Sequence, residues 1–307
     1  MVPAKHMLKN ISRLLFFFLI ISTFFIYGIR PSSATTKGVK KPMPNASSPA
    51  FNPSLKLIAR TPNAYRFISQ HDTAHPKVYC GPAVLAMFFS PLFPELVTGT
   101  PVTYVETFAR HLDTSPRSGT SMLQVLEALD YLNTQDALAQ EWTAVWYQGI
   151  HKVPAHYYHN RKHQAQWASL NADILTALNS GGLVMAHLGW YVEETKQKRF
   201  LRKGGHYVLV TAVYESPEVK GHYYVELMDP LDTVDAFQSR TPRYRLDLRS
   251  VPEEKRAFKV VDPDKQFRSR QVGTGLFQPT PPPGKVGEVM TFLEGFVVLT
   301  KNPSNTI

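Results

Sequence analysis

Helical patterns come first in this chain and β-rich runs follow them, and this order restricts the possible folds more than any other feature. Residues 120–132 carry apolar side chains at helical spacing, and 173–178 form a short helical pattern that Gly181-Gly182 ends. The segments rich in β-forming residues come later, at 183–188, 206–214, 223–229 and 290–299. Helices first and strands afterwards predict an α+β fold with a mainly antiparallel sheet.

The N-terminus has the pattern of a secretory signal. Three cations precede a short apolar run at 14–27, and the small residues P-S-S-A follow at 31–34. We therefore assign 1–34 as a signal peptide or, if it stays uncut, a short membrane anchor through residues 14–29. Either form predicts an exported protein, periplasmic or secreted, or tethered to the membrane.

Composition separates a tether from a folded domain. Residues 35–54 are rich in Pro, Ser, Thr, Lys and Asn and cannot bury enough apolar surface to order themselves. The folded domain is predicted over 55–301, and the 43% hydrophobic content of the chain supports a sizeable core. The net charge is +10, but four cations lie in the first thirty residues, which contain no acid. Because no long Lys/Arg run follows, the sequence predicts no nucleic-acid partner.

Cys80 is the only cysteine among 307 residues. It opens an apolar stretch, and Gly81-Pro82 directly after it suit the first turn of a helix. A helix N-terminus favours the thiolate, which is the nucleophilic form of cysteine. The alternative is a buried structural cysteine. Export weakens that alternative, because an unpaired thiol outside the cytosol is exposed to oxidants.

His206 and Asp229 are the candidate partners of this thiol. His206 follows Gly204-Gly205 and opens an apolar strand, where an imidazole can face a cleft. Asp229 ends the next β-rich run, and an acid there can orient the imidazole and stabilise its protonated form. Taken singly, each residue also fits a structural role, as a hydrogen-bonded histidine at a strand end and as a turn aspartate before proline.

The order of these residues resembles that of the papain-like cysteine peptidases, and most of all the bacterial family related to peptidases that cut double-glycine bacteriocin leaders. The motifs that carry the resemblance are C-G-P-A at 80–83, G-G-H-Y-V-L-V at 204–210 and M-D-P at 228–230. The likeness spans roughly residues 67–299. It implies a papain-like cysteine peptidase fold, with a helical N-terminal half packed on a mainly antiparallel sheet.

The resemblance also implies roles for the site residues. Cys80 would be the nucleophile, His206 the general base and acid, and Asp229 the orienting acid. The family has a glutamine about six residues before the cysteine, where its side-chain amide helps to hold the oxyanion. Here Ala74 stands at that position, and Gln70 becomes the oxyanion donor only if the segment between it and Cys80 bulges. 

Other polar and aromatic residues have alternative readings. Asp232 is a second choice for the orienting acid, and His71, His75 or backbone amides are alternative oxyanion donors. Trp190 and Tyr191 either line a substrate groove or simply pack. Three further histidines have helix-face spacing that suits a transition metal: His156, His159 and His163. No thiolate or fixed acid is near them, so a solvated loop is favoured over a metal site.

These observations predict an exported thiol hydrolase, a cysteine peptidase that cleaves a peptide or amide bond through an acyl-enzyme on Cys80. The predicted partner is a peptide or protein substrate, and no cofactor or metal is expected. Two alternatives stay open: a transpeptidase of the phytochelatin-synthase type, and a catalytically weak pseudo-peptidase that binds a peptide in its cleft.

Overall fold

The computed structural model describes residues 55–92, 99–134, 142–148, 164–165, 170, 172–239, 245–263, 270–273, 275–278 and 289–301. The predicted signal peptide or anchor, the predicted tether and the three-histidine segment near residue 160 lie outside these ranges. Within them, no helix combines the length and apolar character needed to cross a bilayer.

Helices of the described chain begin where the sequence supplies a cap or a proline. Thr100 caps one helix by accepting from the Thr103 backbone N–H, and Pro101 is its first residue. Ser121 and Gln124 exchange side-chain and backbone hydrogen bonds before another, which forms a capping box. The α-helices are α2 (Cys80–Leu92), α3 (Pro101–His111), α4 (Met122–Thr134), α5 (Ala172–Asn179) and α6 (Val234–Ser239), and the 3-10 turns are η1 (Gln70–Asp72), η6 (Thr195–Gln197) and η7 (Glu253–Lys255).

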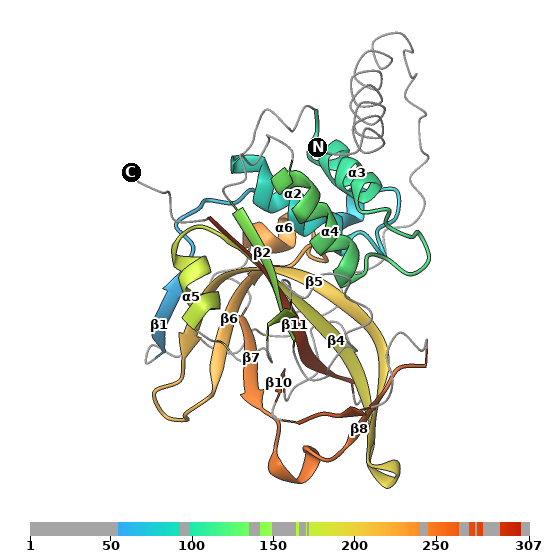
Figure 1. The fold of residues 1–307 in the computed structure, drawn as a ribbon, viewed down its shortest axis with the longest axis vertical. Helices are drawn as coiled ribbons and strands as arrows, with labels where there is room; N and C mark the ends of the chain where they lie inside the picture. Colours follow the sequence, from blue (N-terminus) through green and yellow to red (C-terminus); the bar gives the residue numbers. More distant parts are fainter. Residues whose placement is uncertain are drawn as a thin grey trace, which may run out of the picture. The chain divides into compact units, whose positions relative to one another are not determined.

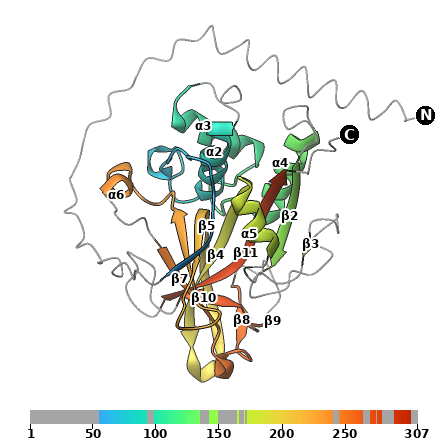
Figure 2. The same cartoon turned by 90° about the vertical axis from the view of Figure 1, so that its left-hand side faces the viewer.

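The strands form one sheet of eleven in the described part of the chain. Three of them, β4, β5 and β11, are long and run side by side (Figure 2). The strands are β1 (Lys56–Arg60), β2 (Trp142–Gln148), β3 (Gln164–Ala165), β4 (Leu183–Glu194), β5 (Arg199–Glu215), β6 (Tyr223–Met228), β7 (Arg245–Ser250), β8 (Lys259–Val261), β9 (Arg270–Gln271), β10 (Leu276–Gln278) and β11 (Val289–Lys301).

Six of these strands close into an antiparallel barrel. The ring of pairings runs β4–β5–β6–β7–β10–β11 and returns to β4. The predicted α+β, papain-like cysteine peptidase fold, with a helical N-terminal half packed on a mainly antiparallel sheet, is therefore wrong. The N-terminal half contributes β1 and β2 to the sheet, and the few helices sit beside a barrel (Figure 1). Closure of the barrel could not be predicted from local sequence patterns, because it is completed by β10, a strand of only three residues.

Three apolar cores lie on the two faces of this barrel wall. The first gathers side chains from all six barrel strands together with α5. The second lies between α2, α3 and α4 and the outer face of β4, β5 and β11, and the third holds Tyr191, Phe200 and Phe292. Because alternate side chains of a strand point to opposite faces, Val208 of β5 enters the first core and Tyr207 enters the second.

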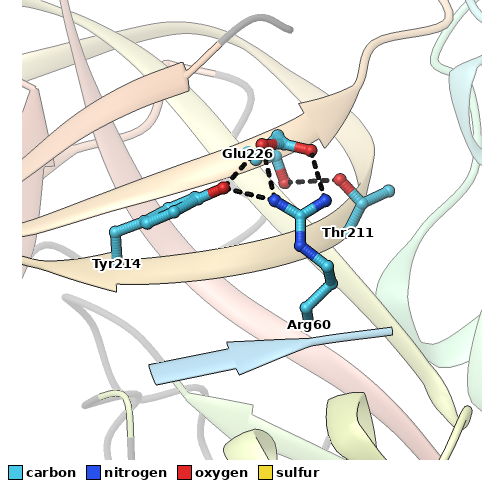
Figure 3. Close-up of polar contacts among 4 residues, drawn as sticks. All are labelled: Arg60, Thr211, Tyr214 and Glu226. Atoms are coloured by element: carbon cyan, nitrogen blue, oxygen red, sulfur yellow. Dashed lines mark hydrogen bonds and ion pairs between the residues drawn. The ribbon is translucent and has the colours of Figure 1, made fainter. Parts of the chain in front are cut away.

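A buried carboxylate ties the first described strand to the barrel (Figure 3). Glu226 of β6 accepts hydrogen bonds from Tyr214 of β5 and from both terminal nitrogens of Arg60 on β1, at 3.1, 3.3 and 3.4 Å. The Glu226 side chain is only 4% exposed, whereas that of Arg60 is 44% exposed. Thr211 of β5 holds the backbone carbonyl of Glu226 at 3.2 Å. These bonds supplement the backbone pairing of β1 with β5.

A second buried carboxylate joins the three long strands. Glu294 of β11 accepts from Arg202 of β5 at 2.7 and 3.0 Å, and from the Tyr191 hydroxyl of β4. Gly189 of β4 makes room for it, because a Cβ there would lie 2.1 Å from the Glu294 carboxylate. Burial alone lowers the pKa of Arg202, but the charge and hydrogen bonds of Glu294 raise that pKa by more, so the guanidinium keeps its charge inside the protein.

We predict that Glu294→Ala lowers the free energy of unfolding by about 3–5 kcal/mol, because it leaves the Arg202 charge buried without its partner. The matched control is Glu194→Ala, which breaks the partly exposed ion pair with Arg199 and should cost about 0.2–1 kcal/mol. Urea unfolding of both variants measures the difference. Equal, small losses would show that the Glu294 pair does not hold the strands together.

Candidate active site

Cys80 is the first residue of α2 and is 9% exposed, which confirms the predicted helix start. A turn closed by the Val78 N–H on the His75 carbonyl, at 3.1 Å, leads into the helix. The first N–H groups of a helix have no partner within it, so those of Cys80 and Gly81 are available as donors. The helix N-terminus thus offers a thiol and backbone donors at one place.

His206 and Asp229 form the second half of the site. The Nε2 atom of His206 lies 2.6 Å from Oδ1 of Asp229, and their side chains are 4% and 20% exposed. The same carboxylate oxygen accepts from the Leu231 backbone N–H at 2.9 Å, which fixes its orientation. With Nε2 on Asp229, Nδ1 is the ring nitrogen left to serve the thiol.

The pKa of His206 shows how these groups interact. Burial by itself lowers it, but the charge and hydrogen bond of Asp229, and then the thiol of Cys80, outweigh burial and raise the pKa to about 10. Cys80 therefore lies close enough to His206 to interact with its ring. A protonated imidazole beside a cysteine is the arrangement that supports a thiolate nucleophile.

Gln70 lies in η1 and is 1% exposed. Its side-chain nitrogen donates to the Pro76 carbonyl, and its side-chain oxygen has no hydrogen-bond partner in the described structure. The expected bulge before Cys80 is present as η1 and the following turn, but the structure shows the Gln70 amide bound within that bulge. An amide NH2 group has a second hydrogen, which this bond does not use.

The segment before Cys80 is bound to the loop after Asp229. Backbone and side-chain atoms of Ser69, Gln70 and His71 bond to the carbonyls of residues 230–232 at 2.7–2.9 Å. These bonds hold the Cys80 entry segment against the turn that carries Asp229. The sequence does not predict this link, because neither segment carries a pattern that points to contact with the other.

The alternative candidates have other roles in the structure. The ring of His71 bonds to the Leu231 carbonyl, and that of His75 lies edge-on to Tyr79 at 5.3 Å. The Asp232 backbone N–H closes the turn on the Asp229 carbonyl, while Asp229 itself holds His206, as the first choice of orienting acid required. No group of three metal-ligating side chains occurs in the ranges that the structure describes.

Trp190 packs directly on the candidate base. Its ring stacks on His206 with centroids 5.7 Å apart and planes inclined at 22°. A Cβ at Gly204 would lie 3.3 Å from the indole, so this glycine lets the ring approach β5 closely. Tyr191, the other aromatic of this pair, is fully buried and donates to Glu294, so it is a packing residue.

In comparisons with known proteins, no protein-family model and no curated protein matches this chain. The geometry of Cys80, His206 and Asp229 therefore carries the functional argument.

We predict that His206 makes stability depend on pH. Its pKa is raised from 6.5 to about 10 on folding, so its stabilising contribution is complete below pH 6.5 and is lost as pH rises through about 10. Urea unfolding of the parent protein across this window should show a falling free energy. His206→Gln and Asp229→Asn should flatten that fall, and equal slopes in all three proteins would contradict the raised pKa.

Proposed function

We propose that this protein is an exported thiol hydrolase that cleaves a peptide or amide bond through an acyl-enzyme on Cys80. The observation that carries the proposal is the 2.6 Å pairing of His206 with Asp229, together with the effect of the Cys80 thiol on the same ring. These three groups are the nucleophile, base and orienting acid of nucleophilic acyl transfer. The likeness to cysteine peptidases rests on this residue order and on no shared fold.

Acylation begins with attack of the Cys80 sulfur on the substrate carbonyl carbon. A C–S bond forms, and the carbonyl π electrons move to oxygen, where the Cys80 backbone N–H and the α2 N-terminus stabilise the negative charge. The His206 imidazolium then gives its Nδ1 proton to the leaving amine as the C–N bond breaks. The products of this half-reaction are the free amine and a thioester on Cys80.

Deacylation uses the same groups in reverse. Water attacks the thioester carbonyl while His206 takes its proton, a C–O bond forms, and the C–S bond breaks to return the thiolate and the imidazolium. Throughout, Asp229 holds Nε2 and stabilises the positive ring. Trp190 stacks on the His206 ring and holds its orientation, so that Nδ1 faces Cys80.

Gln70 is the proposed second oxyanion donor. Its side chain is buried within a segment bound to the Asp229 turn, and one amide hydrogen is not used by Pro76. This position suits a donor fixed in advance, which costs no reorganisation during the reaction.

We predict that Cys80→Ala abolishes turnover, and that His206→Ala lowers it by about 100- to 10,000-fold, the usual contribution of general acid–base catalysis. Asp229→Ala should lower it less, because orienting the ring is only part of the triad's work. The measurements are hydrolysis of a panel of peptide amides, and the mass of an acyl group on Cys80 after acid quenching.

Other outcomes of the same assay identify the alternatives. Peptide binding by the parent protein without turnover or acylation would make it a binding module. Transfer of the acyl group to an added amine in preference to water would make it a transpeptidase.

For Gln70→Ala we predict an acylation rate about 100- to 1,000-fold lower with little change in substrate affinity, which corresponds to about 2.7–4 kcal/mol of transition-state stabilisation. The matched control is Gln197→Ala, because Gln197 is exposed in η6. Single-turnover kinetics separate acylation from binding. A parent-like rate in Gln70→Ala would leave the oxyanion to backbone N–H groups.

A further inference from the structure

A series of side-chain contacts links buried Glu294 to the helical layer. The Nδ1 atom of His187 on β4 lies 3.2 Å from the Glu294 carboxylate. The His187 ring stacks on Tyr207 of β5, with centroids 4.5 Å apart and planes inclined at 20°. The Tyr207 hydroxyl donates to the Thr120 carbonyl at 3.2 Å. Cross-strand pairing places His187 directly opposite Tyr207.

The far end of this series meets the first turn of α2 beside the nucleophile. A Cβ at Gly81 would lie 3.2 Å from the Thr120 side chain and 3.5 Å from the Tyr207 ring. The backbone of Gly81 is therefore packed against both residues without spare room. Thr120 is itself held by Thr114, whose hydroxyl lies 2.8 Å from its own. A shift of Tyr207 would move Gly81, and with it Cys80.

The ring of His187 has a fixed place because its own partner is fixed. Glu294 is 1% exposed and is held at both oxygens by Arg202. A Cβ at Gly205 would lie 2.9 Å from His187 Nε2, so the ring also packs closely on β5. The carboxylate of Glu294 and the ring of Tyr207 both face His187.

We propose that His187 and Tyr207 are positioning residues for the thiol site. His187 supports the face of Tyr207, and Tyr207 sets Thr120 and Gly81, which fix where the Cys80 sulfur lies relative to His206. Neither residue touches the reacting atoms, so both act through others. This inference rests on the proposed function, in which the geometry of Cys80 and His206 determines thiolate reactivity.

The expected effect follows from the sensitivity of reacting groups to small displacements. A misplacement of 1 Å can cost about 100-fold in rate, and a shifted Tyr207 should displace Cys80 by less, so we expect a loss of roughly tenfold. The loss should accompany a move of the pH profile of thiol reactivity to higher pH, because that profile belongs to the coupled Cys80–His206 pair.

The experiment measures the second-order rate of iodoacetamide alkylation of Cys80 in the full chain between pH 5 and 10. Tyr207→Phe keeps the ring but loses the bond to Thr120, and His187→Leu removes the stack. Both should react roughly tenfold more slowly than the parent protein, with the profile moved to higher pH. His187→Phe restores a flat ring on Tyr207 and should return the rate close to that of the parent.

Tyr191→Phe is the matched control for loss of a buried tyrosine hydroxyl. Tyr191 also donates to Glu294, but its ring packs on Phe292 in the third core, at 5.1 Å. The Tyr191→Phe variant should have a lower thermal midpoint than the parent protein but the same pH profile of Cys80 alkylation. If His187 and Tyr207 were merely structural, their variants would behave in the same way.

A parent-like rate and pH profile in Tyr207→Phe would overturn the proposal, and this single-atom change also decides the question should His187→Leu fail to fold. A change in alkylation rate and pH profile no larger than that of Tyr191→Phe would also overturn the proposal. Failure of the proposed function gives a different result, in which Cys80 is alkylated at the same rate in His206→Ala as in the parent protein. The two failures are therefore distinguishable.

Discussion

The hydrogen bond between His206 Nε2 and Asp229 decides which ring nitrogen is left for Cys80. An imidazole held this way presents Nδ1 to the thiol and keeps its positive charge in a buried site, because Asp229 compensates for lost solvation. Without that carboxylate, burial would favour the neutral ring and the thiol would lose its cationic partner. The proposed chemistry depends on this one bond.

The barrel provides the position of this pair. β5 and β6 are neighbouring antiparallel strands, with Leu209 opposite Met228, so His206 near the start of the pairing and Asp229 just after β6 come together at one end. The turn after Asp229 is bonded to the segment around Gln70, which leads to Cys80. Cys80, His206 and Asp229 therefore come from a helix start, the barrel wall and a turn. The buried pair of Glu294 with Arg202 joins β11 to β5 in the same wall.

The sequence predicted the local elements better than their assembly. The start of α2 at Cys80 and the β-rich runs of β4, β5, β6 and β11 followed from apolar patterns and from glycine and proline positions. Barrel closure did not, because it depends on the three-residue strand β10 and on nonlocal registers that no local pattern encodes. The resemblance to papain-like peptidases carried an incorrect fold along with its residue order.

In the candidate site too, some residues were recognisable from local sequence, whereas others became evident only from nonlocal contacts. Cys80 and Asp229 were recognisable because one opens α2 and the other directly follows β6. His206 was recognisable by the Gly204-Gly205 pair before it, but it lies inside β5 and does not open that strand as predicted. His187, Tyr207 and Thr120 were not recognisable, since their contacts cross strands and loops distant in sequence. Glu226 and Glu294 lie inside β-rich runs, where a carboxylate usually marks an exposed position, and only the structure shows that each is buried with its cation.

Nitrogen-15 NMR of the histidine rings, with His206 assigned by comparison with His206→Gln, measures whether the buried His206 ring carries a positive charge. We expect both His206 ring nitrogens to carry protons at pH 8, and the ring to lose its charge with a midpoint near pH 10. Asp229→Asn should lower that midpoint. A neutral His206 ring at pH 8, with a midpoint close to the ordinary value of 6.5, would show that Asp229 does not keep the ring charged.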